Sequence, residues 1–380
     1  MSLCPKLLFT MLCATATVAT PAAGQSAWTF GGVLDVSASS RSHPLGARDR
    51  GLSLGHSDVT IAGPLGSAFD LRLTGAAHTH ERKLEAHVEE VSLTTRTLPF
   101  GLQLKAGRFA SQLGYLNEQH PHADDFIERP LPYRAFFGQH WFDDGVRLNW
   151  TAPTETYLRL GAEAFRGRQL VPEAASARRP GVLVFSARTG SDLGDSMSWQ
   201  AGASWIDNRR EAALEHEHDD AGADGHDHAH DHPHAHGAAF SGRRGMVLDA
   251  VWKWAPGGNA KNEQVRLAGE YVRINRPNRF ARSSDRHAGG YLSLVYRFQP
   301  AWEAGVSAGW LDVRIPHDEH FHPGRLREAS IMLAYKPGHL QSYRLQATRV
   351  SGARGFGEVP AWRVGVQVVL AIGAHPAHSY

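Results

Sequence analysis

Histidines and carboxylates cluster in three segments of this 380-residue chain: "HPHADD" at 120–125, a long tract at 216–236, and "HDEHFH" at 317–322. Imidazole mixed with carboxylate suits zinc and the neighbouring transition metals. We therefore treat the three segments as candidate metal-binding sites. The candidate ligands are His120, His122, Asp124, Asp125, His216, His218, His226, His228, His230, His232, His234, His236, His317, His320 and His322.

The tract at 216–236 holds eight histidines and five aspartates, with no lysine or arginine. It has almost no apolar content that could offset the entropy cost of ordering. Imidazoles are mostly neutral near pH 7 and are common metal ligands, so the tract is typical of a flexible array that captures zinc, copper, nickel or cobalt. The alternative is a hydrophilic low-complexity loop without a metal.

The N-terminus indicates export. Lys6 precedes an apolar run that closes on small residues, which predicts a signal peptide over 1–24. Cys4 and Cys13 would leave with it, and a lipoprotein at Cys13 is disfavoured because Leu12 stands where a small residue is needed. No later run reaches the roughly 18 to 20 apolar residues of a membrane-spanning helix. With 40 Lys plus Arg against 38 Asp plus Glu, no nucleic-acid partner is expected.

Period-two alternation of apolar and polar residues dominates the rest of the chain, most clearly from Trp362 to Ile372. Many of these runs reach about ten residues, the length of a tilted membrane strand, whereas strands of soluble sheets peak at roughly five or six. The alternation predicts about sixteen strands, near 28–40, 51–63, 67–80, 84–95, 100–109, 142–152, 156–167, 181–190, 196–207, 243–256, 262–275, 287–299, 301–314, 325–336, 339–351 and 361–372.

The connections alternate in length. Turns such as "GPLGS" and "KPGH" follow the even-numbered runs, whereas the two longest connections, 110–141 and 208–242, follow odd-numbered ones. Short turns on one side and long loops on the other are typical of a bacterial outer-membrane barrel. We predict one all-β domain over 25–380, a transmembrane antiparallel up-and-down β-barrel in a Gram-negative outer membrane. A soluble secreted sandwich is the alternative, and no fixed repeat indicates a β-helix.

Side chains opposite the apolar stripe of each strand must line the lumen. This wall leans basic, which favours anions in a pore, although any water-filled barrel carries mixed charge for solvation and strand register. The predicted pore-lining bases are Lys105, Arg147, Arg159, Arg266, Arg297, Arg344 and Arg363.

The loop at 110–141 is too apolar in its second half for a solvated excursion, and loops of this length are usually functional. We expect it to fold into the barrel mouth and to carry the "HPHADD" ligands to the constriction. Alternatively, Arg129 and Arg134 pair with the acids of this loop in a structural polar network. The apolar side chains are Phe126, Ile127, Leu131, Tyr133, Phe136 and Phe137.

The stretch "LKAGRFASQLGYLNEQHPHADDFIERPLPYRAFFG", followed by "DDGVRLNWTAPTETYLRLGAEAFRG", resembles a proteobacterial family of zinc-linked outer-membrane proteins. More broadly the chain looks like the phosphate-selective porin-like superfamily, in which a strand ending in Gly-Arg-Phe leads into a long inward loop. The resemblance is strong over about 100–167 and architectural elsewhere. It implies a monomeric or homotrimeric barrel that passes small solutes, and a link to zinc. A TonB-dependent transporter would need a plug domain ahead of the first strand, and little chain precedes it.

These observations predict a channel, not an enzyme, because no nucleophile motif or paired-carboxylate spacing stands out. We expect a plug-less porin-like channel that gathers divalent metal, zinc above all, at its external loops and lets it pass free or chelated. No resident cofactor is expected, and the metal would be a bound substrate. The alternatives are an anion-preferring porin with incidental histidines and a surface metal-binding barrel without transport. Expected partners are outer-membrane lipid, lipopolysaccharide and the barrel assembly machinery.

Overall fold

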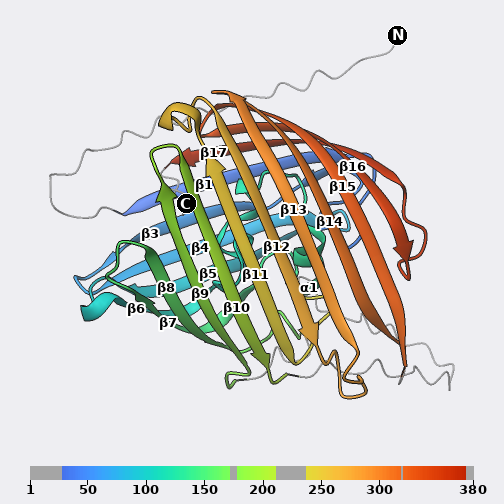
Figure 1. Cartoon of the computed structure of the whole chain (residues 1–380), viewed down its shortest axis with the longest axis horizontal. Coiled ribbons are helices and arrows are strands. Elements are labelled where there is room, and N and C mark those ends of the chain that lie inside the picture. Colours follow the sequence, from blue (N-terminus) through green and yellow to red (C-terminus); the bar gives the residue numbers. More distant parts are fainter. Residues whose placement is uncertain (1–27, 172–177, 211–236, 318–319, 374–380) are drawn as a thin grey trace, which may run out of the picture.

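The computed structural model describes residues 28–171, 178–210, 237–317 and 320–373. The expected signal peptide at 1–24 and the histidines of 216–236 lie outside these residues. Within them, strands that follow one another along the chain pair antiparallel, except for two short strands that both pair with the first, and the last strand also pairs with the first, so the sheet closes (Figure 1).

The prediction of an all-β barrel is confirmed, because the strands form a closed antiparallel barrel of sixteen strand positions. One position, expected as a single strand over 51–63, is filled by two short strands in line, β2 and β3, which both pair with β1. The strands are β1 (Thr29–Ser39), β2 (Gly51–Leu54), β3 (Ser57–Leu65), β4 (Phe69–His80), β5 (Lys83–Thr95), β6 (Leu102–Ala110), β7 (Phe142–Thr151), β8 (Tyr157–Phe165), β9 (Val182–Leu193), β10 (Met197–Asn208), β11 (Arg244–Trp254), β12 (Gln264–Asn275), β13 (Arg286–Gln299), β14 (Trp302–His317), β15 (His320–Gly338), β16 (Gln341–Arg354) and β17 (Trp362–Gly373).

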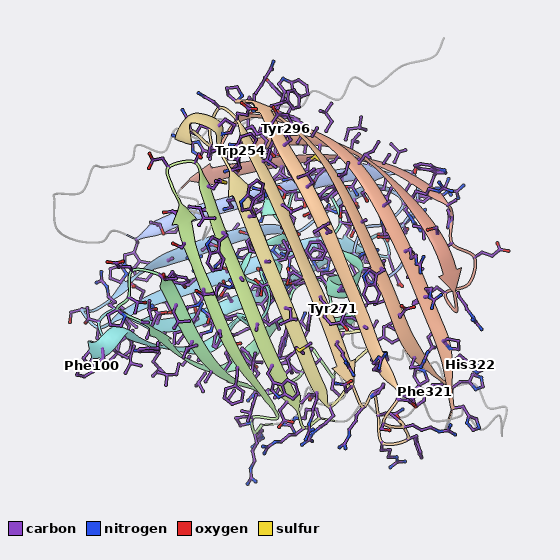
Figure 2. The ribbon with its side chains drawn as sticks, viewed as in Figure 1. Phe100, Trp254, Tyr271, Tyr296, Phe321 and His322 are labelled. Carbon is purple, nitrogen blue, oxygen red and sulfur yellow. The ribbon has the colours of Figure 1, made fainter. Side chains whose placement is uncertain are left out.

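The outer face of the barrel is apolar. Large side chains such as Leu52 (78 % exposed) and Ile331 (61 %) point away from the lumen and have no protein cover. Figure 2 shows Trp254 and Tyr296 together at one rim and Phe321 at the opposite rim. An apolar band between aromatic rims is the lipid-facing surface of a membrane-spanning barrel.

Among the described residues, no helix is long and apolar enough to cross a membrane.

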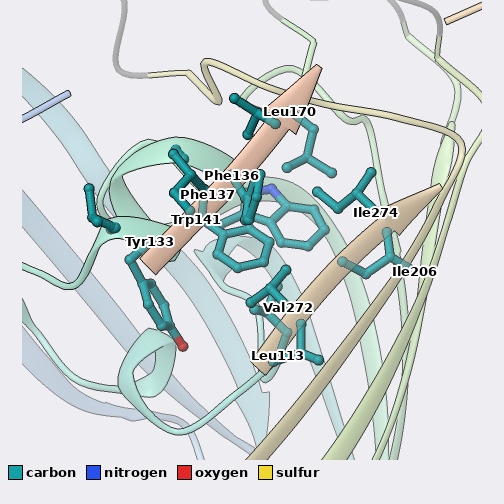
Figure 3. Close-up of a cluster of buried hydrophobic side chains, with 14 of the residues drawn as sticks. Leu113, Tyr133, Phe136, Phe137, Trp141, Leu170, Ile206, Val272 and Ile274 are labelled. Atoms are coloured by element: carbon teal, nitrogen blue, oxygen red, sulfur yellow. The ribbon is translucent and has the colours of Figure 1, made fainter. Parts of the chain in front are cut away.

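The segment 111–141 between β6 and β7 lies inside the barrel and carries the helix α1 (Leu131–Phe136), which contacts β13 and β14 (Figure 1). Its apolar half is fully buried, with Tyr133, Phe136, Phe137 and Trp141 at 0 % exposure. Figure 3 shows these rings packed against inward side chains of the barrel wall, such as Val272. Burying a side chain of this size contributes about 1.5–3 kcal/mol, so the cluster anchors the loop strongly.

Polar contacts anchor the same segment at several points of the wall. Glu270 on β12 accepts hydrogen bonds from the Tyr133 hydroxyl (2.9 Å) and from the backbone N–H groups of Tyr115 (3.1 Å) and Leu116 (3.0 Å). Gln346 on β16 accepts one from the backbone N–H of Ile127 at 2.7 Å. The loop is therefore held to distant strands by both apolar packing and hydrogen bonds.

Candidate metal centre

Four histidines and two carboxylates meet where the loop at 111–141 faces β3 and β5. They fall into two groups, within each of which the ligand atoms lie within 4.8 Å of one another. Three of the six side chains come from the barrel wall and three from the loop. The six residues, named below as the histidine centre, are His56, Asp58, Glu89, His120, His122 and His140.

His56 reaches the centre because the strand is interrupted there. Leu54 pairs with Val36 of β1, and Asp58 pairs with Val33 of β1. Between these two pairs β1 has two residues, whereas the facing chain has three, 55–57. A one-residue insertion of this kind is a β-bulge, which re-aims side chains. Gly55 fits the bend because a Cβ at this position would overlap a buried guanidinium group. The extra residue shifts the alternation by one, so that His56 and Asp58 face the lumen as Ser53 does before the bulge.

Glu89 depends on a second bulge. Two consecutive residues of β4 pair with Val88 and Glu90, so Glu89 has no cross-strand partner. Glu89 and Glu90 are both 5 % exposed, whereas Val88 and Val91 on either side are 54 % and 42 % exposed. Two successive carboxylates therefore point into the lumen. Only Glu89 joins the histidines, because Glu90 forms an ion pair with Lys105 at 2.7 Å.

His140 is oriented by a backbone contact. Its Nε2 lies 2.7 Å from the carbonyl oxygen of Asn117. A carbonyl oxygen only accepts, so Nε2 donates its hydrogen and Nδ1 keeps a free lone pair. This Nδ1 is buried without a hydrogen-bond partner and lies 4.0 Å from Glu89 Oε1. Metal-binding histidines are commonly oriented in this way, with the second ring nitrogen bonded to a carbonyl or carboxylate.

The imidazole–carboxylate distances within the histidine centre run from 3.2 to 4.0 Å, and the shortest of them equal those around a small tetrahedral ion. His56 Nε2 lies 3.3 Å from Glu89 Oε2, and His120 Nδ1 lies 3.6 Å from the same oxygen. His122 Nδ1 lies 3.2 Å from Asp58 Oδ2. Bonds of about 2.05 Å around a tetrahedral zinc separate adjacent ligand atoms by about 3.3 Å.

The loop histidines are suited to bind a cation at neutral pH. Burial lowers the pKa of His120 to about 4, although the charge of Glu89 opposes this shift. Burial also lowers the pKa of His140 well below its ordinary value. Both imidazoles are therefore neutral near pH 7, the state in which imidazole binds a metal.

The structure places the two aspartates of "HPHADD" with arginines. Asp124 forms an ion pair with Arg129 (2.7 Å) and Asp125 with Arg266. Of the four predicted ligands in this motif, the structure thus brings together only His120 and His122.

The third histidine segment lies at the far end of the β14–β15 hairpin. The rings of His317 and His322 are 5.4 Å apart. Both side chains are exposed, as is that of His320. Figure 2 shows His322 at the rim of the barrel, outside the lumen.

The bases predicted to line the pore face inward, and each has a polar partner. Arg159 and Arg266 pair with acids of the inward loop, and Arg344 donates to the carbonyl oxygen of His122, which places these three around the loop. The pairs are Lys105–Glu90, Arg147–Glu163, Arg159–Glu118, Arg266–Asp125, Arg297–Glu303, Arg344–Gln367 and Arg363 with the carbonyl oxygen of Ser42.

Two cavities flank the loop. One of about 350 Å³ lies toward the end of the barrel that carries the long loops, called here the long-loop side. It is lined by Glu89 and His140 of the histidine centre and by Gly237 of the long connection between β10 and β11. The other, of about 530 Å³, is lined by Arg159 and Arg188 and by residues near the short turns. The histidine centre therefore borders the cavity of the long-loop side.

Four members of the histidine centre were missed by sequence reasoning: His56, Asp58, Glu89 and His140. A signal existed for Glu89, because "VEEV" breaks the apolar–polar alternation by one residue. His140 stands in an aromatic stretch, "FFGQHW", which favoured an anchoring role.

A scan of the chain against models of known protein families gives no match. One relative in sequence is an uncharacterized protein of Aquifex aeolicus (strain VF5). It is 26 % identical over 357 residues, which cover 87 % of this chain and 70 % of that protein.

Solved structures with a similar fold are outer-membrane proteins. OprB of Pseudomonas putida (TM-score 0.59, 11 % identity) matches over 92 % of this chain and 94 % of its own. A loop-deletion mutant of OmpT from Vibrio cholerae (0.57, 11 %) and an anion-selective porin from Comamonas acidovorans (0.54, 10 %) each match over 92 % of this chain and 100 % of their own. Together with the apolar outer face, this fold identifies an outer-membrane β-barrel of porin-like architecture.

Proposed function

We propose that this protein is a porin-like channel that binds a divalent transition metal, with zinc the best match, at the histidine centre. The observation that carries the proposal is the orientation of His140, whose buried Nδ1 points toward Glu89 while Nε2 is bonded to a carbonyl oxygen. A histidine with a purely structural role would be expected to use both nitrogens in hydrogen bonds when buried.

The position of the centre links binding to transport. It joins the inward loop to β3 and β5, beside the cavity on the long-loop side. In outer-membrane barrels the long loops face the medium. A metal that entered from outside would meet the centre before the basic surroundings of the second cavity. The proposal assigns transport to the chain, and no catalysis.

Zinc binding to the purified barrel in detergent tests the proposal. Residues 216–236 are first deleted, so that their eight histidines do not contribute. We expect one tight zinc ion per barrel, and loss of this ion when His120 and His140 are both changed to alanine. The matched control is the His317→Ala, His322→Ala variant, which should bind as the parent does. Equal binding by all three proteins would refute the metal centre.

A second candidate, an anion-preferring porin, is favoured by the basic residues around the loop, such as Arg159 and Arg188. One of the solved structures of similar fold is an anion-selective porin. Reversal potentials in a salt gradient separate the two candidates, measured in planar bilayers with and without micromolar zinc. An anion preference that zinc leaves unchanged would favour the second candidate.

A further inference from the structure

The histidine centre contains two overlapping sets of ligands. The first set is Glu89, His120 and His140, and the second is His56, Asp58, His120 and His122, so that His120 belongs to both. His56 also touches both sets, because its Nε2 lies 3.3 Å from Glu89 and 3.7 Å from Asp58. His120 is therefore a ligand in either position, and His56 lies between the two carboxylates.

The two sets differ in access. Glu89 and His140 line the cavity of about 350 Å³ on the long-loop side, together with His56. All four side chains are buried to the same extent, at 5–6 % exposure, but Asp58 and His122 are not among the described residues that line this cavity. Glu89 and His140 of the first set therefore border the cavity, and Asp58 and His122 of the second set lie away from it.

The two sets also differ in the coordination they can offer. The first supplies one carboxylate and two imidazoles, and a zinc ion with three protein ligands keeps an open position for water. The second supplies one carboxylate and three imidazoles, which complete a tetrahedral shell. An ion gains a ligand when it passes from the first set to the second, so the passage inward is favourable.

We propose that a single divalent ion is captured at Glu89–His120–His140 and is then handed to His56–Asp58–His120–His122. This inference rests on the proposed function, because it requires that the centre binds a metal. The ion exchanges Glu89 and His140 for His56, Asp58 and His122, while His120 stays bound to it. The centre then acts as a transfer site on the inward path, with an entry position and a holding position.

Cobalt(II) is a suitable probe, because its visible absorption is weak in five- and six-coordinate shells and strong in tetrahedral ones. Three protein ligands leave room for additional waters on cobalt, whereas four protein ligands complete a tetrahedral shell. We expect the barrel lacking 216–236 to bind one equivalent of cobalt. In stopped-flow mixing, we expect the absorption to change in two phases, in which a weak spectrum forms first and then develops into a strong one. The Asp58→Asn, His122→Ala variant should stop at the weak spectrum and bind at least about tenfold more weakly.

The Glu89→Gln, His140→Ala variant should reach the same strong spectrum as the parent, but at least about tenfold more slowly. The His317→Ala, His322→Ala variant is the control for both. Native folding is checked by heat-modifiable migration, and a double variant that does not fold is replaced by Asp58→Asn or Glu89→Gln alone.

The outcomes separate the two proposals. If the parent binds no cobalt, the metal centre itself fails, and the transfer fails with it. If it binds cobalt in one phase, or takes two equivalents, or loses the strong spectrum in the Glu89→Gln, His140→Ala variant, the metal centre stands and the transfer is refuted.

Discussion

The histidine centre and the hairpin rim that carries His317 and His322 use the same residue types in similar sequence patterns, but only one is an enclosed site. In the centre, the side chains come from two bulges and an anchored loop, and their atoms already lie at the separations of a tetrahedral shell. At the rim, two exposed imidazoles face solvent. Affinity for a metal depends on ligands that are already in place, and sequence spacing alone does not show this.

The largest expected effect comes from removing ligands of the histidine centre. The same change at the hairpin rim is its control. In the barrel lacking 216–236, His120→Ala with His122→Ala should weaken zinc binding by at least about 100-fold. Total zinc binding energies of about 10–16 kcal/mol, shared among four ligands, give several kcal/mol for each ligand. The His317→Ala, His322→Ala variant should change affinity by less than about threefold. Competition with a chromogenic chelator measures both, and similar losses in the two variants would abolish the distinction.

The second largest effect on stability and zinc affinity is expected from weakening the apolar anchor of the loop. Trp141 is fully buried, and its ring stacks on Phe137 with centroids 6.3 Å apart. Changing it to alanine should cost about 3–5 kcal/mol of stability and weaken zinc binding about tenfold, because the loop that carries His120 and His122 loses its support. Thermal loss of heat-modifiable migration gives the stability. A destabilised variant with unchanged zinc affinity would show that the ligands do not need the anchor.

Removing only the hydroxyl of Tyr133 is a milder version of the same test. Tyr133→Phe deletes its hydrogen bond to Glu270 and keeps the ring. We expect a loss of about 1–2 kcal/mol and a zinc affinity within about threefold of the parent. Thermal denaturation and zinc titration of the same preparation check both values. A collapse of zinc binding would mean that one hydrogen bond, and not the apolar cluster, positions the loop.

The smallest expected effect concerns charge. Arg159 and Arg188 both pair with Glu118 of the loop, at 2.5 Å each. Replacing both by glutamine should reduce anion preference modestly, since charged pore walls set selectivity at close range. Reversal potentials in a potassium chloride gradient measure the change. An unchanged potential would place these side chains outside the conducting path, whatever the zinc affinity.

The barrel could be predicted closely from the sequence, because alternation repeats on every strand and the run at 361–372 matches β17 (Trp362–Gly373). The apolar half of the loop at 110–141 likewise indicated burial. The bulges could not be predicted, because one extra residue resembles a strand end when alternation is the only signal. His56 and Asp58 lie at one strand position and Glu89 lies on β5, and only the inward fold of the loop brings His120 beside them.

The anchors of the loop have a consequence for the order of folding. All six members of the histidine centre lie between His56 and His140, in the first part of the chain. Two of the groups that hold the loop in place lie far later, at Glu270 and Gln346. Contacts of such sequence separation form late, because a long chain segment must be closed first. The ligands are thus synthesised early, whereas two anchors of the loop that carries three of them are in place only when β12 and β16 have joined the sheet.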